Sequence, residues 1–231
     1  MAESTTRALI SAPPFIRLVA GLADADLGNS APVLADRLGQ WIDWNRAITL
    51  SRALDQPPPP APDPVADASG EAECAQARAT LQQGIAGEPL LAPRGGADVA
   101  CVDFGPYRER YLALQRAMHG ATGRLRGALR DRLAAGPIQM ARLAEVDALM
   151  EQVLAPREQR WLASVPALLG ERFERLRPAS PDPADPAAPA ASPLPGDWLD
   201  AFQQDMRAAL LAELDFRFQP LDALLAALRA G

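Results

Sequence analysis

The chain is poor in the residue types that carry most metal and nucleophile chemistry. It holds 231 residues, yet His119 is its single histidine, and Cys74 and Cys101 are its two cysteines. A structural zinc site needs several cysteine or histidine ligands at close spacing, and a ferritin-like di-iron site needs two Glu-x-x-His motifs. The sequence contains neither pattern. Two cysteines do not make a disulfide framework in a chain of this length, so we expect both to be reduced thiols.

Lysine is absent altogether, so all 23 basic residues are arginine. A phosphate-binding loop of the Walker type requires a lysine, and the Gly-x-Gly-x-x-Gly pattern of dinucleotide sites does not occur either. For His119 we favour a position at a helix surface, or at a helix break before Gly120, over a catalytic role. We therefore expect a protein that is not an enzyme and that needs no cofactor and no metal.

Long apolar runs are also missing. No stretch approaches 18 apolar residues free of charge, which is about the length that a transmembrane helix needs. The apolar segment from Pro13 to Ala23 is too short for a signal peptide and is interrupted by Arg17. We therefore expect a cytoplasmic protein that does not itself span a membrane.

The sequence lacks runs of β-branched residues that alternate with polar ones, which are the signature of strands. Apolar residues recur instead at intervals of three and four, as on one face of an α-helix. The most regular example is an a/d seam, the pattern through which helices pack side by side at about 20°. It comprises Tyr107, Tyr111, Leu114, Met118, Ala121, Leu125 and Ala128. We predict an all-α fold, a helical bundle with coiled-coil-like packing and up-down connections.

Prolines concentrate in two segments, residues 56–67 and residues 178–195. Proline does not fit a helix interior and favours extended polyproline II structure, so we predict that both segments are linkers that interrupt the bundle. The linkers divide the chain into an N-terminal helical pair at 13–55, a central helical bundle at 68–177, and a C-terminal helix at 196–231 that packs on the bundle.

Helical spacing and good capping residues predict the helices at the start of the chain. The first helix carries an apolar face of Phe15, Leu18, Val19 and Leu22. A second helix begins near Ser30, which is a favoured N-cap residue. In the central block, a short helix covers residues 71–85 and a loop follows it.

Glycine and proline predict where the later helices are interrupted. Gly136 and Pro137 end the helix that carries the a/d seam. The next helix presents Leu143, Val146, Met150 and Val153 on its inner face, and Pro156 and Pro166 kink or interrupt it. In the last block, Pro220 kinks the helix or ends it near residue 219.

Charge is distributed unevenly along the chain. The net charge is −6, which weighs against a protein whose whole surface binds nucleic acid. Between residues 104 and 136, however, seven arginines stand against two acidic residues, a net +5, so the remainder carries −11. These arginines either pair with acidic helices of the same bundle or dock an anionic partner. As candidate partner-binding residues we select Arg116, Arg124, Arg126, Arg130 and Arg132.

Two further features are candidates for partner contacts. Trp41 lies on an apolar seam and Trp44 lies nearly opposite it, and tryptophan is enriched at binding hot spots. Core packing is the alternative for both. The apolar stripe from Leu210 to Leu228 belongs either to the last core helix or to a helix offered to another subunit, as in a homo-oligomer. The sequence leaves these alternatives open.

Four segments resemble an uncharacterised proteobacterial family, a domain of unknown function: residues 15–54, 108–118, 154–177 and 210–228. The resemblance spans most of the chain outside the proline-rich segments. The family has no assigned catalytic residues, so the resemblance supplies none here. Its genes are associated with genes for membrane proteins that look like ion-driven motor or channel components. The resemblance thus implies an accessory protein of a membrane assembly, with a membrane-associated coiled-coil protein as its partner.

Taken together, the helical seams, the proline-rich spacers and the missing catalytic residues favour a non-enzymatic protein that binds other proteins through amphipathic helices, such as an adaptor. The alternative is a protein that binds nucleic acid through the arginine-rich helix at residues 108–132.

Overall fold

The structure is a computed structural model that describes residues 14–22, 44–55, 70–92, 102–178 and 197–230. No strand occurs in the described ranges, so the predicted all-α class is confirmed. The elements are α1 (Pro14–Leu22), α3 (Trp44–Asp55), α4 (Glu71–Ala86), the 3-10 turn η1 (Pro89–Leu91), α5 (Gly105–Ala134), α6 (Ile138–Leu162), α7 (Val165–Leu176) and α8 (Asp197–Ala230). The start of the predicted helix near Ser30 and both predicted linkers lie outside the described residues.

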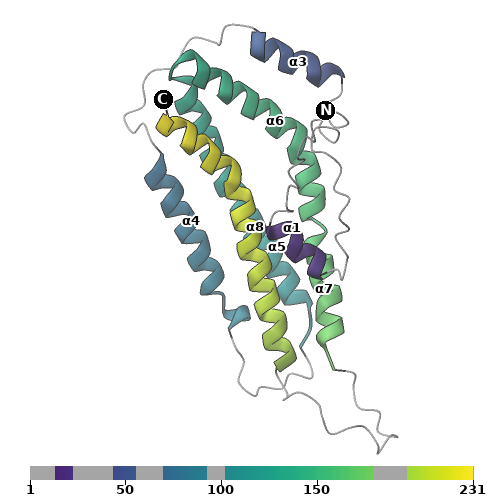
Figure 1. Ribbon diagram of the computed structural model, residues 1–231. Helices are drawn as coiled ribbons and strands as arrows, with labels where there is room; N and C mark the ends of the chain where they lie inside the picture. Colours follow the sequence, from purple (N-terminus) through teal and green to yellow (C-terminus); the bar gives the residue numbers. More distant parts are fainter. Residues whose placement is uncertain (1–13, 23–43, 56–69, 93–101, 179–196, 231) are drawn as a thin grey trace, which may run out of the picture.

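Helices α5 and α8 form the central pair of an elongated bundle (Figure 1). They run in the same direction, because Tyr107 and Tyr111 of α5 contact Gln203 and Glu213 of α8 in the same order. Helix α4 covers one side of this pair, and α6, α7 and α1 cover the other. Successive long helices alternate in direction, so the up-down connections follow the prediction. No helix within the described ranges is both long and apolar enough to cross a bilayer.

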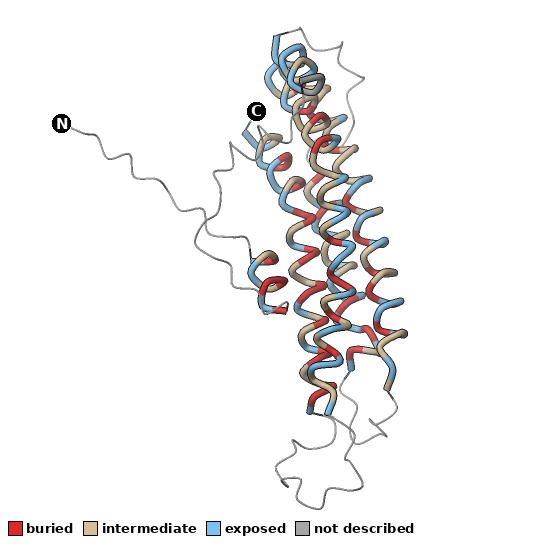
Figure 2. The backbone as a smooth tube through the Cα atoms, turned by 90° about the vertical axis from the view of Figure 1, so that its right-hand side faces the viewer, coloured by how far each residue is buried: buried red, intermediate tan, exposed pale blue. Residues whose placement is uncertain are grey.

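Helix α8 contributes more buried residues than any other described helix, because apolar side chains recur along it every three or four positions. The predicted stripe is buried at Leu210, Leu214, Phe218, Leu221 and Leu225, and its last member, Leu228, is half-buried. Figure 2 shows the buried residues lining the facing sides of the long helices along the bundle. Side chains from the N-terminal, central and C-terminal blocks, including Phe15, Tyr107 and Phe218, belong to one continuous core.

An aromatic cluster fills the core where α7 meets the first turns of α5 and α8. Phe173 is fully buried at its centre, and its ring lies 5.0 Å from that of Phe202 and 5.2 Å from that of Trp198. Phe104 packs over Gly170, where an added Cβ would lie only 2.9 Å from the Phe104 ring. Such edge-on ring pairs add to the stabilisation that burial of their area provides.

The predicted a/d seam holds only in the first half of α5. Its first four members are buried. Farther along, the buried positions are Thr122, Leu129 and Leu133, whereas Ala121 and Ala128 are half-buried and Leu125 is half-buried against the core. A repeat of 3.5 residues drifts around a helix of 3.6 residues per turn unless the helices supercoil. Beyond Met118 the buried face therefore steps forward by one position.

The predicted inner face of α6 was also wrong for Leu143, which is 39% exposed. Helix α6 contacts α5 on one side and α3 on another, and it turns the small residues Ala141 and Ala144 inward together with Leu149 and Val153. Val146 and Met150 are half-buried. Spacing alone did not reveal that α6 is shared between two neighbours.

The helix interruptions follow the prediction in part. Helices α5 and α6 are separated at Gly136 and Pro137, as predicted. Pro156 and Pro220 instead lie inside α6 and α8, which continue through them, so Pro220 does not end its helix. Helix α6 ends before residues 163–164, which separate it from α7. Pro166 lies in the first turn of α7, where a backbone N–H has no partner within the helix, so its absence loses no hydrogen bond.

Helix α5 is also unbroken at His119 and Gly120, against one of the two predicted alternatives. The glycines in the middle of α5 are not sites where another helix packs closely. A Cβ at Gly123 or Gly127 would meet nothing within 4 Å, and one at Gly120 would meet only the end of the Arg124 side chain at 3.5 Å.

Candidate functional site

The arginine-rich face of α5 lies mainly against acidic side chains of the same chain. Arg126 donates two hydrogen bonds to Asp147 of α6, at 2.9 and 2.6 Å. Arg130 pairs with Glu151 at 2.7 Å and with Asp147 at 3.7 Å. Asp147 and Glu151 are one turn apart on α6, and Arg126 and Arg130 are one turn apart on α5. The two carboxylates therefore face the two arginines.

Two further arginines of α5 pair with the α4 side of the bundle. Arg132 contacts Glu73 at 3.1 Å, and Arg110 contacts the buried Glu88 at 2.5 Å. Arg116 and Arg124 are exposed and make no ion pair within the described part of the chain. Of the five arginines selected from the sequence, three are therefore engaged inside the bundle, and two face solvent.

The two candidate tryptophans fall at the edge of the described residues. Trp41 lies outside the described residues. Trp44 is the first residue of α3, but its side chain is not among those described.

The sequence reasoning missed a charged group at the centre of the bundle. Glu213 of α8 is 0% exposed and accepts hydrogen bonds from Arg217, from the Tyr111 hydroxyl at 2.8 Å and from the Gln115 amide at 3.1 Å. Arg217, which is 8% exposed, gives Nε and Nη2 to the same carboxylate oxygen at 2.9 and 2.7 Å. Burial, and secondly the charge of Glu213, raise the pKa of Tyr111 well above its ordinary value.

A signal for this pair was present in the sequence. Glu213 and Arg217 are four residues apart, which places them on one side of a helix, and both adjoin the apolar stripe of α8. A carboxylate and a guanidinium at that spacing beside a buried stripe form the kind of pair that can enter a core together.

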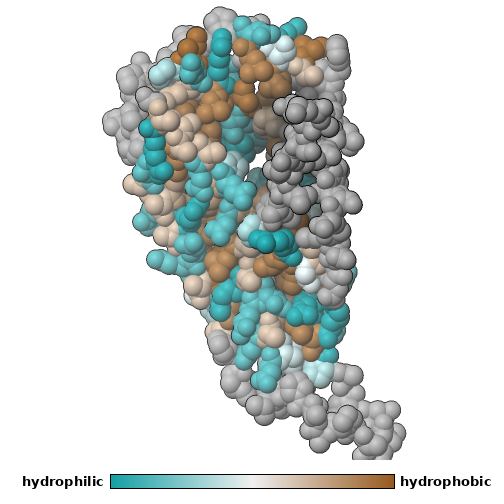
Figure 3. Space-filling model, viewed as in Figure 1, coloured by the Kyte–Doolittle hydropathy of each residue, from teal (hydrophilic) through white to brown (hydrophobic). Residues whose placement is uncertain are grey.

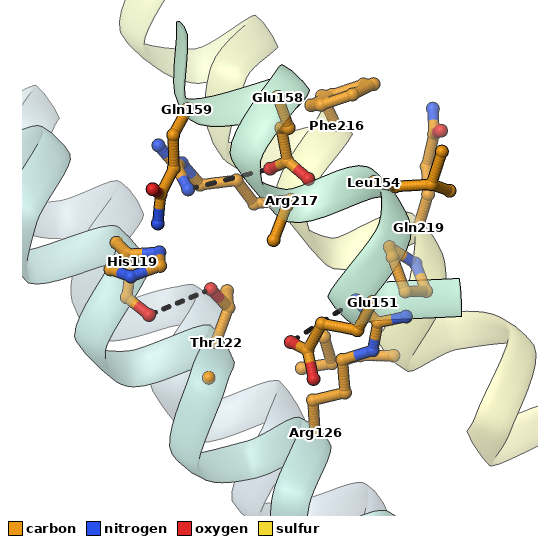
Figure 4. A pocket seen from close by; sticks show the side chains of 14 residues that line it. His119, Thr122, Arg126, Glu151, Leu154, Glu158, Gln159, Phe216, Arg217 and Gln219 are labelled. Atoms are coloured by element: carbon orange, nitrogen blue, oxygen red, sulfur yellow. Dashed lines mark hydrogen bonds and ion pairs between the residues drawn. The ribbon is translucent and has the colours of Figure 1, made fainter. Parts of the chain in front are cut away.

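A cleft of about 200 Å³ opens beside this pair, between α5, α6 and α8. Figure 4 shows His119 and Arg126 approaching it from α5, Glu151 and Glu158 from α6, and Arg217 from α8. Apolar side chains that include Leu154, Phe216 and Leu221 complete the lining. His119 thus lies on a helix surface, in keeping with one of the two predicted alternatives.

Prolines lie at the cleft in two of its helices. Pro220 of α8 is part of the lining, and Pro156 of α6 follows the lining residue Ala155. A proline inside a helix lacks an N–H and its ring crowds the preceding turn, which kinks the helix. The carbonyl of Phe216 therefore has no N–H partner at position 220.

The polar groups of the cleft are incompletely paired. Nη1 of Arg217 lies 3.8 Å from Glu158, beyond hydrogen-bond distance. Burial raises the pKa of Glu158, although the charges of Arg217, Arg126 and His119 oppose the shift. No group of three histidine, cysteine or acidic side chains in the described ranges is placed to hold a metal ion.

Exposed apolar side chains gather at one end of the molecule. Within the described ranges, the large hydrophobic residues that stand out from the surface are Leu54 at 50%, Ile138 at 54% and Leu143 at 39% exposed. All three belong to α3 or to the first two turns of α6, and these two helices contact each other. We refer to these three residues as the distal apolar patch. Figure 3 shows apolar surface at the same end of the bundle.

Comparison with known proteins identifies the family. Residues 1–230 match a family model described as "Protein of unknown function (DUF3348)". The match covers nearly the whole chain, so the protein belongs to this family. No curated protein and no solved structure matches the chain.

Proposed function

We propose that this protein is a non-enzymatic interaction protein that uses its distal apolar patch to bind an amphipathic helix of a protein partner. The observation that carries the proposal is the position of the exposed apolar side chains. Single exposed leucines are ordinary on protein surfaces. Here, Leu54, Ile138 and Leu143 fall on two helices that contact each other, and such grouping is typical of interaction sites.

A polar feature next to the patch supports a partner that also carries an acidic group. Nε of Arg142, between Ile138 and Leu143 in the sequence, is buried and has no hydrogen-bond partner. A buried donor without an acceptor is costly, so a partner carboxylate that draws the Arg142 side chain outward would relieve that cost. An amphipathic helix with an apolar stripe and a neighbouring aspartate or glutamate meets both requirements. A cytosolic coiled coil belonging to a membrane assembly is a partner of this chemistry.

Nucleic-acid binding through residues 108–132 receives less support from the structure. Arg110, Arg126, Arg130 and Arg132 already contact carboxylates of the same chain. Phosphate contacts by these arginines would compete with those pairs, so the positive charge available on this helix is smaller than the sequence suggests.

The experiment is site-specific photo-cross-linking in the organism from which the gene comes. A photoreactive amino acid replaces Ile138 or Leu143 in the full chain, and the control replaces the exposed Gln82 on α4. We expect a discrete protein adduct from the two patch positions, and its loss when Arg142→Ala is added to the cross-linking variant at position 138. Equal yields at positions 82 and 138 would contradict the proposal.

The mass of the adduct separates the possible partners. A second copy of the chain would give twice its own mass and make the patch a homo-oligomer interface. An adduct that nuclease treatment removes would favour the nucleic-acid alternative and overturn the proposal.

A further inference from the structure

We propose that the cleft between α5, α6 and α8 binds a small organic anion, a single carboxylate carried on an apolar or aromatic body. This site is separate from the distal apolar patch, and the inference does not depend on the proposed interaction function. It rests on the unpaired nitrogen of a buried arginine, on the groups that converge with it, and on the size and lining of the cleft.

Arg217 provides the anchor for the carboxylate. Its side chain is 6% exposed, and Nε and Nη2 are both committed to Glu213. Nη1 carries two more N–H donors, and its nearest acid, Glu158, lies 3.8 Å away. Arg217 also lines the cleft, so a ligand carboxylate can supply the acceptor that Nη1 lacks. Glu213 meanwhile neutralises the buried charge before any ligand arrives.

His119 and Glu158 complete the polar end of the site. Figure 4 draws the Glu158 carboxyl beside the Arg217 guanidinium, at 3.8 Å, and the Gln159 amide between this guanidinium and the His119 imidazole in that view. An imidazole N–H donates to a carboxylate whether the ring is neutral or charged. Burial raises the pKa of Glu158, which weakens the repulsion that its carboxylate exerts on a bound anion.

The dimensions of the cleft select a small ligand. Its volume of about 200 Å³ lies below the range of about 300–1,000 Å³ for drug-sized ligands, which favours a small ligand. An engineered apolar cavity of about 150 Å³ holds benzene, and this cleft therefore has room for one ring with a carboxylate. Phe216, Leu154 and Leu221 supply apolar surface for the body of such a ligand.

The test uses three probes that share one ring and differ in charge: benzoate, benzyl alcohol and benzylamine. His119 is the single histidine of the chain, so its ring signals in a nuclear magnetic resonance spectrum are unambiguous once any histidine tag is removed. We expect benzoate to shift these signals saturably, with a Kd on the order of 1 mM for so small a ligand. Benzyl alcohol and benzylamine should bind at least about tenfold more weakly, because they lack the charge-assisted hydrogen bonds.

Two glycine variants of α5 test whether benzoate binds in the cleft. Gly123 lines the cleft and Gly127 does not, and an added side chain would meet nothing within 4 Å of its Cβ at either position. Leucine is also a better helix former than glycine, so both variants should fold. We expect Gly123→Leu to lose benzoate binding and Gly127→Leu to retain it. Glu158→Gln, which removes a negative charge from the lining, should also bind benzoate.

Three results would overturn the inference. The first is the absence of a saturable shift with benzoate in the unmodified chain, which would show that the cleft does not bind this anion. The second is equal binding of the three probes, which would show that Arg217 and His119 do not select an anion. The third is binding by Gly123→Leu as strong as by Gly127→Leu, which would place the ligand elsewhere.

Discussion

The two ends of the bundle are stabilised in different ways. At the aromatic end, where α7 meets the first turns of α5 and α8, Phe173 packs against Phe202 and Trp198, and charged groups such as Arg177 and the Arg172–Asp205 pair lie at the margin of the cluster. At the charged end, where the last turns of α5 meet α6, Arg126 and Arg130 face Asp147 and Glu151. Apolar burial provides large but non-directional stabilisation, whereas ion pairs provide little net stability and fix orientation. The candidate sites lie toward the charged end, where packing is less complete.

The largest expected effect comes from opening a cavity at the aromatic end. Phe173→Ala removes a fully buried ring that contacts four other aromatic side chains, and we expect a loss of about 3–5 kcal/mol in the free energy of unfolding. Phe216→Ala, at the half-buried edge of the cleft, is the matched aromatic control and should cost less. Urea unfolding followed by circular dichroism measures both. Equal losses would remove the contrast between the two ends.

The central ion pair should come next. Glu213→Gln leaves the buried Arg217 with only the more distant Glu158 carboxylate, at 3.8 Å, and we expect a loss of about 3 kcal/mol, measured by the same unfolding experiment. The double variant Glu213→Leu with Arg217→Met removes both charges and should recover most of that loss. Glu171→Gln on the surface of α7 is the control for the single change. A double variant no more stable than the single one would mean that the pair itself, not its uncompensated half, stabilises the fold.

Neighbouring arginines of α5 provide a smaller and sharper contrast. Arg126→Leu breaks a two-fold hydrogen bond to Asp147, and we expect a loss of about 2 kcal/mol in thermal or urea unfolding. Arg124→Leu changes an exposed arginine without an ion pair in the described ranges and should stay within about 0.5 kcal/mol of the unmodified chain. The reverse order would indicate that the internal pairing adds nothing to the fold.

The smallest expected effect concerns pH. Because burial raises the pKa of Glu158, the folded state binds its proton more tightly than the unfolded state does. This contribution to stability is fully present below the unfolded pKa of about 4.3 and is lost as pH rises through the folded pKa. Glu158→Gln should therefore gain stability relative to the unmodified chain as the pH rises from about 4 to about 7. A difference that does not change with pH would show that Glu158 titrates normally.

The aromatic end and the central helix could be predicted from the sequence, and the charged end only in part. Apolar side chains at intervals of three and four fix the buried face of α8, and its Leu210 and Leu214 are indeed fully buried. The same reasoning put Leu143 inside and Thr122 outside the core, because periodicity identifies a face but not the number of helices that share it.

The role of the arginines could not be settled from one helix. The surplus of arginine in α5 was visible, but its partners Asp147 and Glu73 lie 21 and 59 residues from Arg126 and Arg132. Only the fold decides which acids meet which arginines. The cleft could not be predicted from the sequence either, because its lining comes from three helices whose relative positions only the fold determines.

Amide hydrogen exchange of Arg126→Leu, read helix by helix against the unmodified chain, tests the contrast between the two ends most directly. The account predicts faster exchange in α6 and in the last turns of α5, with unchanged protection in α7 and in the first half of α8. Uniform loss of protection over all these helices would show that the bundle opens as one unit, and would contradict the division into an aromatic end and a charged end.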